Sequence, residues 1–74
     1  MFDYKIHEHI ALLSESGEAS KRLSVISWNG AAPKIDIRGW KIAEDGVKPL
    51  KGISLSQSEA LALRDALVEY FGAS

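Results

Sequence analysis

The chain has 74 residues, of which 46% are hydrophobic and 26% charged; its net charge is -1 and it contains no cysteine. This length predicts one small domain, residues 1–74, and the balanced composition excludes a globally disordered chain. The lack of cysteine excludes disulfides and thiolate metal sites, and small domains without such support often oligomerise, so we expect a dimer. No apolar run approaches the ~20 residues of a membrane span, and the first residues lack a signal-peptide pattern, so we expect a soluble, cytoplasmic protein.

The net charge conceals a segregation along the chain. Residues 1–20 sum to -3, residues 21–52 to +4 and residues 53–74 to -2. Charges act within about one Debye length, roughly 8–10 Å, so the basic middle can attract an anion although the whole chain is acidic. Small surfaces also scatter charge without any function, so the segregation alone does not define a partner.

Alternation of apolar and polar residues predicts the first two strands. The first covers residues 4–13, and the small polar residues 14–20 after it predict a flexible connection. The second covers residues 23–28, which are rich in strand formers. Asn29-Gly30 then predicts a hairpin turn, because both residues tolerate positive φ.

The second half of the chain predicts two more strands and a helix. Residues 34–40 alternate strictly, residues 41–50 form either a long loop or a loose ribbon, and residues 51–55 form a short fourth strand. Residues 56–59 match a capping box, which predicts a helix that runs to about Phe71 and stops at Gly72. Its apolar stripe, at helical spacing, consists of Ala60, Leu63, Leu67, Tyr70 and Phe71.

Period-two alternation also assigns the two faces of the sheet. The face predicted to point into the core carries Leu23, Val25, Ile35 and Ile37. The opposite face then carries Arg22, Ser24, Ile26, Trp28, Lys34, Asp36, Arg38 and Trp40. Because one helix covers only one face, we expect this second face to be open, with both tryptophans on it.

An open face that combines tryptophans with cations suits single-stranded nucleic acid. Unpaired bases stack on indole rings, at roughly 1–3 kcal/mol per base and with little regard to sequence, while cations contact the phosphates. The alternative is that Trp28 and Trp40 lie in the core or in a dimer interface, as most aromatic residues of small domains do. Periodicity alone leaves both interpretations open.

Other residue clusters give weaker indications. His7 and His9 share a predicted strand face, but no third metal ligand lies nearby and a solvated face is the simpler interpretation. Asp36 with Glu44 and Asp45 could form the metal site of a nuclease, although an Asp within a cationic strand is more often an ion-pair partner of a neighbouring Arg or Lys. We find no nucleophile elbow and no phosphate-binding glycine loop, so the sequence predicts no enzyme and no cofactor.

Two blocks at characteristic separation, residues 33–40 and 48–56, resemble the transcriptional coactivator family called positive cofactor four. The preceding Ser27-Trp28-Asn29-Gly30 makes the chain similar to the bacterial, YdbC-like branch. The likeness covers residues 21 to about 70 and is strongest over 27–56. It implies a four-stranded curved antiparallel sheet followed by a C-terminal helix (ββββα, class α+β), a homodimer formed largely through the helices, and binding of single-stranded DNA on the sheets.

The resemblance also implies roles for particular residues. Trp28 and Trp40 would stack bases, Arg38, Lys48 and Lys51 would contact phosphates, and Gly52 would belong to the basic loop that enters strand four. Pattern and charge add four further nucleic-acid contacts: Lys21, Arg22, Asn29 and Lys34. The dimer interface would contain Leu63, Leu67, Tyr70 and Phe71.

We therefore expect a homodimer that binds single-stranded DNA with little sequence preference and supports transcription, replication or repair, nucleoid-associated if the source is bacterial. Neither a membrane nor a small-molecule substrate is expected. RNA stays open as a ligand, because stacking and phosphate contacts do not read the 2′-hydroxyl. The first alternative function is a protein-interaction or regulatory module that uses the tryptophan patch, and the second is the metal-dependent nuclease.

Overall fold

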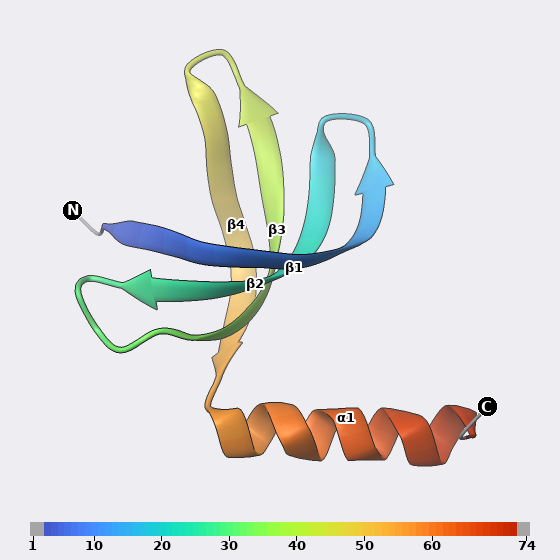
Figure 1. Cartoon of the computed structure of the whole chain (residues 1–74). Coiled ribbons are helices and arrows are strands. Elements are labelled where there is room, and N and C mark those ends of the chain that lie inside the picture. The colour runs from blue at the N-terminus through green and yellow to red at the C-terminus, as the bar shows by residue number, and fades with distance from the viewer. Residues whose placement is uncertain (1–2, 73–74) are drawn as a thin grey trace.

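The computed structural model describes residues 3–72, which form one four-stranded sheet and one helix (Figure 1). The elements are β1 (Tyr4–Ser16), β2 (Ala19–Trp28), β3 (Lys34–Ala43), β4 (Gly46–Leu55) and α1 (Gln57–Phe71). All neighbouring strands are antiparallel and lie in chain order, β1-β2-β3-β4. The predicted ββββα order is confirmed.

Two of the three connections between strands are tighter than the sequence predicts. The expected flexible stretch 14–20 instead extends β1 and β2 to a turn at Gly17, whose φ is 58°. Of the two alternatives for residues 41–50, the loop is wrong and the ribbon is right, since β3 and β4 continue to a turn before Gly46. Hydrogen bonds to the neighbouring strand hold these residues in an extended conformation. The propensities of the residues themselves do not reveal whether such a partner strand is present.

Local signals predict the remaining boundaries correctly. Asn29 and Gly30 have φ of 52° and 79°, and the N–H of Ala31 donates to the Trp28 carbonyl at 2.9 Å to close the turn. At the start of α1, Ser56 Oγ accepts from the Glu59 N–H at 3.2 Å, and the Ser56 N–H donates to Glu59 Oε1 at 2.8 Å. The helix ends at Gly72, whose φ is 88°. The predicted capping box and stop are confirmed because both depend on neighbouring residues only.

The sheet bends so strongly that side chains level with the two ends of β2 meet inside the bend. Tyr4 is in register with Trp28, and Trp40 is in register with Ser20. Ser20 and Trp28 lie eight residues apart, roughly 26 Å along an extended strand. Yet the rings of Tyr4 and Trp40 are 5.6 Å apart. Three bulges in β1 and one irregularity between β3 and β4 accompany this bend, which is visible in β1 and β2 in Figure 1.

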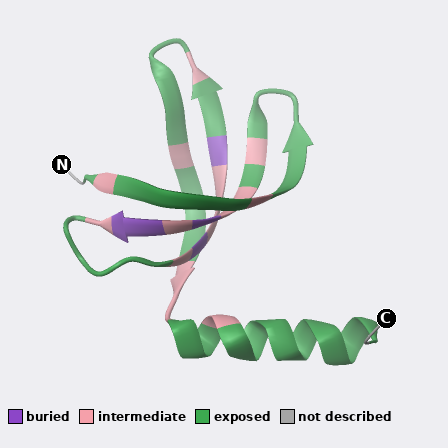
Figure 2. Cartoon of the chain, viewed as in Figure 1, coloured by how far each residue is buried: buried purple, intermediate pink, exposed green. Residues whose placement is uncertain are grey.

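The side chains inside the bend form what we call the inner face of the sheet, and this face holds most of the buried residues (Figure 2). The buried residues of the described chain are Ser24, Ile26, Ser27, Asp36 and Trp40. The inner face is the one predicted to be open. Alternation assigned its residues correctly, but the prediction of an open surface is wrong, because curvature packs these side chains against one another.

The outer face, which the sequence predicts to be the core, is only partly covered. Together with α1 it forms an apolar groove of about 300 Å³, lined by Leu13, Leu23, Ile35, Ile37, Leu55, Ala60, Leu63, Arg64 and Leu67. No described residue of α1 is buried, and the helix runs away from the end of β4 (Figure 1). Tyr70 and Phe71 are 82% and 74% exposed.

None of the helices within residues 3–72 is long and apolar enough to cross a membrane.

Candidate nucleic-acid interface

Three aromatic side chains meet on the inner face. The ring of Tyr4 lies 5.1 Å from that of Trp28 and 5.6 Å from that of Trp40. Trp40 is only 3% exposed, whereas Tyr4 and Trp28 are partly exposed. Periodicity left core and surface positions open for both tryptophans. Trp40 takes the core position inside the bend and is not the accessible ring that the resemblance implies. Of the two tryptophans, only Trp28 is partly exposed.

A buried carboxylate organises the neighbourhood of Trp28. Asp36 is 1% exposed, and its Oδ1 accepts from Arg38 Nε at 2.6 Å. Its Oδ2 accepts from Arg38 Nη2 and Ser54 Oγ, each at 2.8 Å, and from Trp28 Nε1 at 3.1 Å. This confirms the interpretation of Asp36 as an ion-pair partner of a neighbouring cation, Arg38.

These contacts keep Asp36 ionised. Burial alone would raise the pKa of Asp36, because an apolar environment disfavours a charge. The hydrogen bonds from Arg38, Ser54 and Trp28 and the charge of Arg38 outweigh burial, so the pKa lies below its ordinary value. The carboxylate is thus a fixed negative charge against which donors are aligned.

Arg38 lies over the ring of Trp28. Its guanidinium carbon is 4.3 Å from the centre of the Trp28 ring, which is cation–π geometry. Nη1 of Arg38 also donates to the Leu50 carbonyl at 3.1 Å, and the side chain is 15% exposed. Arg38 is therefore held in place, with its charge balanced by Asp36.

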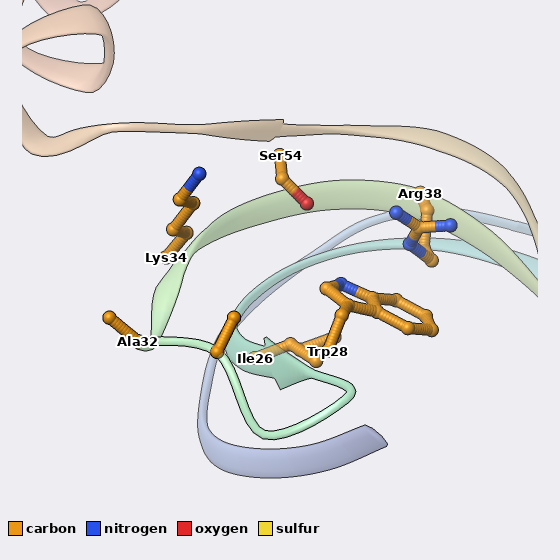
Figure 3. A pocket seen from close by; sticks show the side chains of 7 residues that line it. Ile26, Trp28, Ala32, Lys34, Arg38 and Ser54 are labelled. Carbon is orange, nitrogen blue, oxygen red and sulfur yellow. The ribbon is translucent and has the colours of Figure 1, made fainter. Parts of the chain in front are cut away.

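A recess of about 330 Å³ opens beside this pair. It is lined by Ile26, Trp28, Ala31, Ala32, Lys34, Arg38 and Ser54. Figure 3 shows Lys34 at one side of the recess and Arg38 above the indole of Trp28 at the other. Its volume is at the lower end of the range of about 300–1,000 Å³ for small-ligand sites, and its lining combines an aromatic ring, aliphatic groups and two cations.

The structure divides the predicted contact residues between the two faces. Inner-face positions, deduced from the strand register, are held by Arg22, Trp28, Lys34, Arg38, Trp40 and Gly52. Lys21 and Lys48 belong to outer-face rows, opposite Gly39 and Lys41 respectively. The recess brings together only Trp28, Lys34 and Arg38 from the predicted set.

Several predicted contacts have structural partners of their own. Asn29 Oδ1 accepts from the Asp3 N–H at 2.8 Å, so its side chain ties the start of β1 to the β2–β3 turn. Lys48 pairs with Asp45 at 3.2 Å on the surface. The predicted basic loop before strand four is itself part of β4, in which Lys51 is exposed. Arg22 Nε donates to Ser20 Oγ at 3.0 Å, outside the recess.

Gly52 serves the close approach of two strands. A Cβ at this position would lie 2.0 Å from Arg38 Cβ and 2.5 Å from the Ile37 carbonyl oxygen. No residue other than glycine fits there without moving β3 from β4. The role of Gly52 within the block at residues 48–56 is therefore one of strand packing.

Two residues of the site were not predicted. Tyr4 touches both tryptophans, and Ser54 donates to Asp36. Period two along β4 places Ser54 on the same face as Gly52, so its side of the sheet was readable from the sequence. The contact of Tyr4 with Trp40 was not readable, since it depends on the bend.

The described residues 3–72 contain no group of three or more His, Asp or Glu side chains that could hold a metal ion. The predicted pairing of His7 with His9 on one face is wrong. His7 Nε2 is in hydrogen-bond contact with Ser27 Oγ at 3.1 Å, whereas His9 is in register with Ser24. Ser24 and Ser27 are three residues apart on β2 and hence on opposite faces; the bulge between Ile6 and Glu8 separates the two histidines.

The chain is a curved ββββα sheet with an aromatic and cationic recess on its inner face. Comparison with known sequences identifies the class of protein. The family described as Transcriptional Coactivator p15 (PC4) matches residues 16–66. An uncharacterized protein of Treponema pallidum (strain Nichols) is 43% identical over 67 residues, which are 89% of this chain and 76% of that protein.

The chain therefore belongs to the PC4 family, as the motifs at 33–40 and 48–56 indicate. The family consists of non-enzymatic, DNA-binding transcription cofactors, and membership supports a DNA-binding function.

Proposed function

We propose that this protein is a homodimer that binds single-stranded DNA with little sequence preference, and that it supports transcription, replication or repair. The observation that carries the proposal is the recess on the inner face, where Trp28 lies under Arg38 with Lys34 at the rim. Family membership supports the ligand class.

The proposed mechanism is stacking combined with electrostatic attraction. A base enters the recess and stacks on the Trp28–Arg38 pair, which suits any base because every base has a π-face. Exposed Lys34 then contacts the adjacent phosphate. Trp40 supports the aromatic cluster from below instead of stacking. Of the remaining predicted cations, exposed Lys51 would meet a phosphate beyond the recess, whereas Lys21 and Lys48 lie on outer-face rows and are not part of the proposed site.

The test is fluorescence anisotropy with a labelled single strand of about 20 nucleotides, titrated against salt. We expect a log–log slope near -3, which corresponds to about four neutralised phosphates at roughly -0.7 each. Competition with duplex DNA and with single-stranded RNA of the same sequence identifies the preferred ligand. Absence of binding at low salt would contradict the proposal, and equal binding of duplex would contradict the stacking mechanism.

Variants locate the site. Trp28→Ala should weaken binding by about 1–3 kcal/mol, the contribution of one stacked base. Lys34→Gln should weaken binding and reduce the slope by about 0.7. Lys5→Gln is the matched control, because Lys5 is exposed and its register with Ser27 places it on the outer face. Equal effects of the two lysine variants would contradict a site on the inner face.

The proposed dimer covers the apolar groove and helix with a second copy of the chain. The groove wall contains Leu63 and Leu67, and the stripe continues beyond the groove to Tyr70 and Phe71, which are exposed in the single chain. A patch of this kind on a single chain marks an interaction site. Because no residue of α1 is buried within the chain, a partner is needed to remove this stripe from water.

Light scattering tests the dimer. Leu67→Glu should halve the molecular mass, because a charge would be placed in the proposed interface. Val47→Glu is the control, since Val47 is 45% exposed and Leu67 47%, but Val47 lies on the β3–β4 hairpin away from α1. A dimeric mass for Leu67→Glu, or a monomeric mass for the wild type, would contradict the proposal.

A further inference from the structure

Among the described residues, only Asp36 has a carboxylate that accepts hydrogen bonds from both Trp28 and Arg38, the two groups on which a base is proposed to stack. It accepts from the indole N–H of Trp28 and twice from the guanidinium of Arg38, whose central carbon lies over the Trp28 ring, 4.3 Å from the ring centre. Ser54 adds a fourth hydrogen bond from the neighbouring strand β4. The indole and the guanidinium are thereby held by one buried carboxylate.

We propose that Asp36 is a positioning residue for DNA binding, which locks Trp28 and Arg38 into a prestacked surface and makes Arg38 a stacking group instead of a phosphate-binding cation. This inference rests on the proposed function. It assigns a role that neither family membership nor the motif spacing contains.

The charge balance supports the second half of this inference. The carboxylate of Asp36 neutralises Arg38 within one bidentate pair, and the third bond of Arg38 goes to the Leu50 carbonyl. A guanidinium tied in this way and 15% exposed presents its flat face and little net charge to a ligand. Stacking on guanidinium planes is a recognised mode of base binding, and prior fixation lowers the entropy cost of binding.

Fold stability alone does not account for the arrangement. A buried ion pair commonly stabilises a protein no more than apolar residues of similar volume, because desolvation offsets the attraction. Here the pair lies at the wall of a recess and holds an aromatic ring, which is what a preorganised binding surface requires.

The variant that tests the inference is Asp36→Asn, which keeps the side-chain volume and removes the charge. Its control is Asp65→Asn, the same charge change at an exposed aspartate paired with Arg64 on α1. For single-stranded DNA we expect Asp36→Asn to steepen the salt slope by about 0.7, since Arg38 becomes free to neutralise one phosphate. At the high-salt end of the titration its affinity should fall roughly 5- to 150-fold, the loss of one stacked base.

A second measurement does not involve DNA. Acrylamide quenching of tryptophan fluorescence reports on Trp28, because Trp40 is 3% exposed and shielded from the quencher. Asp36→Asn should increase quenching and Asp65→Asn should not. Far-UV circular dichroism shows whether Asp36→Asn folds, and if it does not, Ser54→Ala takes its place. Ser54→Ala removes one hydrogen bond to Asp36 and should increase quenching. It should leave the salt slope unchanged, because the ion pair between Asp36 and Arg38 remains.

The outcomes separate the two proposals. Unchanged quenching overturns the positioning role whether or not the protein binds DNA. Increased quenching with a slope equal to that of Asp65→Asn overturns the stacking role of Arg38. If the wild type binds no single strand, the proposed function fails, and the quenching result still decides whether Asp36 fixes Trp28.

Discussion

Replacing Trp40 with alanine should destabilise the fold rather than remove a base-stacking group. Trp40 is 3% exposed and its ring packs 5.6 Å from that of Tyr4. Truncation of a buried tryptophan to alanine costs about 3–5 kcal/mol, because packing contacts are lost and a cavity remains. Nε1 of Trp40 has no hydrogen-bond partner among the described residues. Because the substitution also removes this unsatisfied buried donor, we expect the loss of unfolding free energy to be about 3 kcal/mol, the lower end of that range.

Thermal unfolding followed by circular dichroism measures this loss. For a domain of this size each kcal/mol shifts Tm by roughly 4–8 °C, so we expect a decrease of roughly 12–24 °C. All samples need one protein concentration, because the Tm of a dimer depends on it. Trp28→Ala is the comparison: its Tm should fall less, while its DNA affinity falls more. A Tm for Trp40→Ala within roughly 4 °C of the wild type, together with a loss of DNA affinity of about tenfold, would refute the assignment of Trp40 to the core.

Three other substitutions test features of the fold and the site. Gly52→Ala should lower the free energy of unfolding in urea by roughly 1–3 kcal/mol, because its Cβ would lie 2.0 Å from Arg38 Cβ. Gly39→Ala is the control, since the atom nearest to its Cβ would be 3.4 Å away. Equal losses in the two variants would contradict the packing role of Gly52. Burial raises the pKa of Asp36, but its hydrogen bonds hold it below the ordinary 3.8. The stability that this carboxylate contributes is thus complete above pH 3.8 and is lost as the pH falls through the lower, folded-state pKa. The urea midpoint should fall in that acidic window, and Asp36→Asn should remove this part of the fall. Ser56→Ala should cost about 1 kcal/mol and reduce helicity, and an unchanged urea midpoint would contradict the capping role.

Most of the secondary structure could be predicted from the sequence because its determinants are local. The capping box at Ser56 and the stop at Gly72 satisfy backbone groups within one turn of the helix, so no distant residue is needed to define its ends. The turn at Asn29 and Gly30 depends only on their tolerance of positive φ. Strand structure was not predicted in full at the tips of two hairpins, residues 14–20 and 41–50. The extended conformation of these segments depends on pairing with another strand.

Alternation along each strand likewise determined which residues share a face of the sheet, and the register confirms this for Trp28, Arg38 and Trp40. It could not determine which face lies inside the bend. Curvature arises from bulges and twist accumulated over four strands, and it brings together rings that a flat sheet would hold far apart. Only the tertiary structure therefore decided that Trp40 is buried and that Trp28 and Arg38 both donate to the buried carboxylate of Asp36.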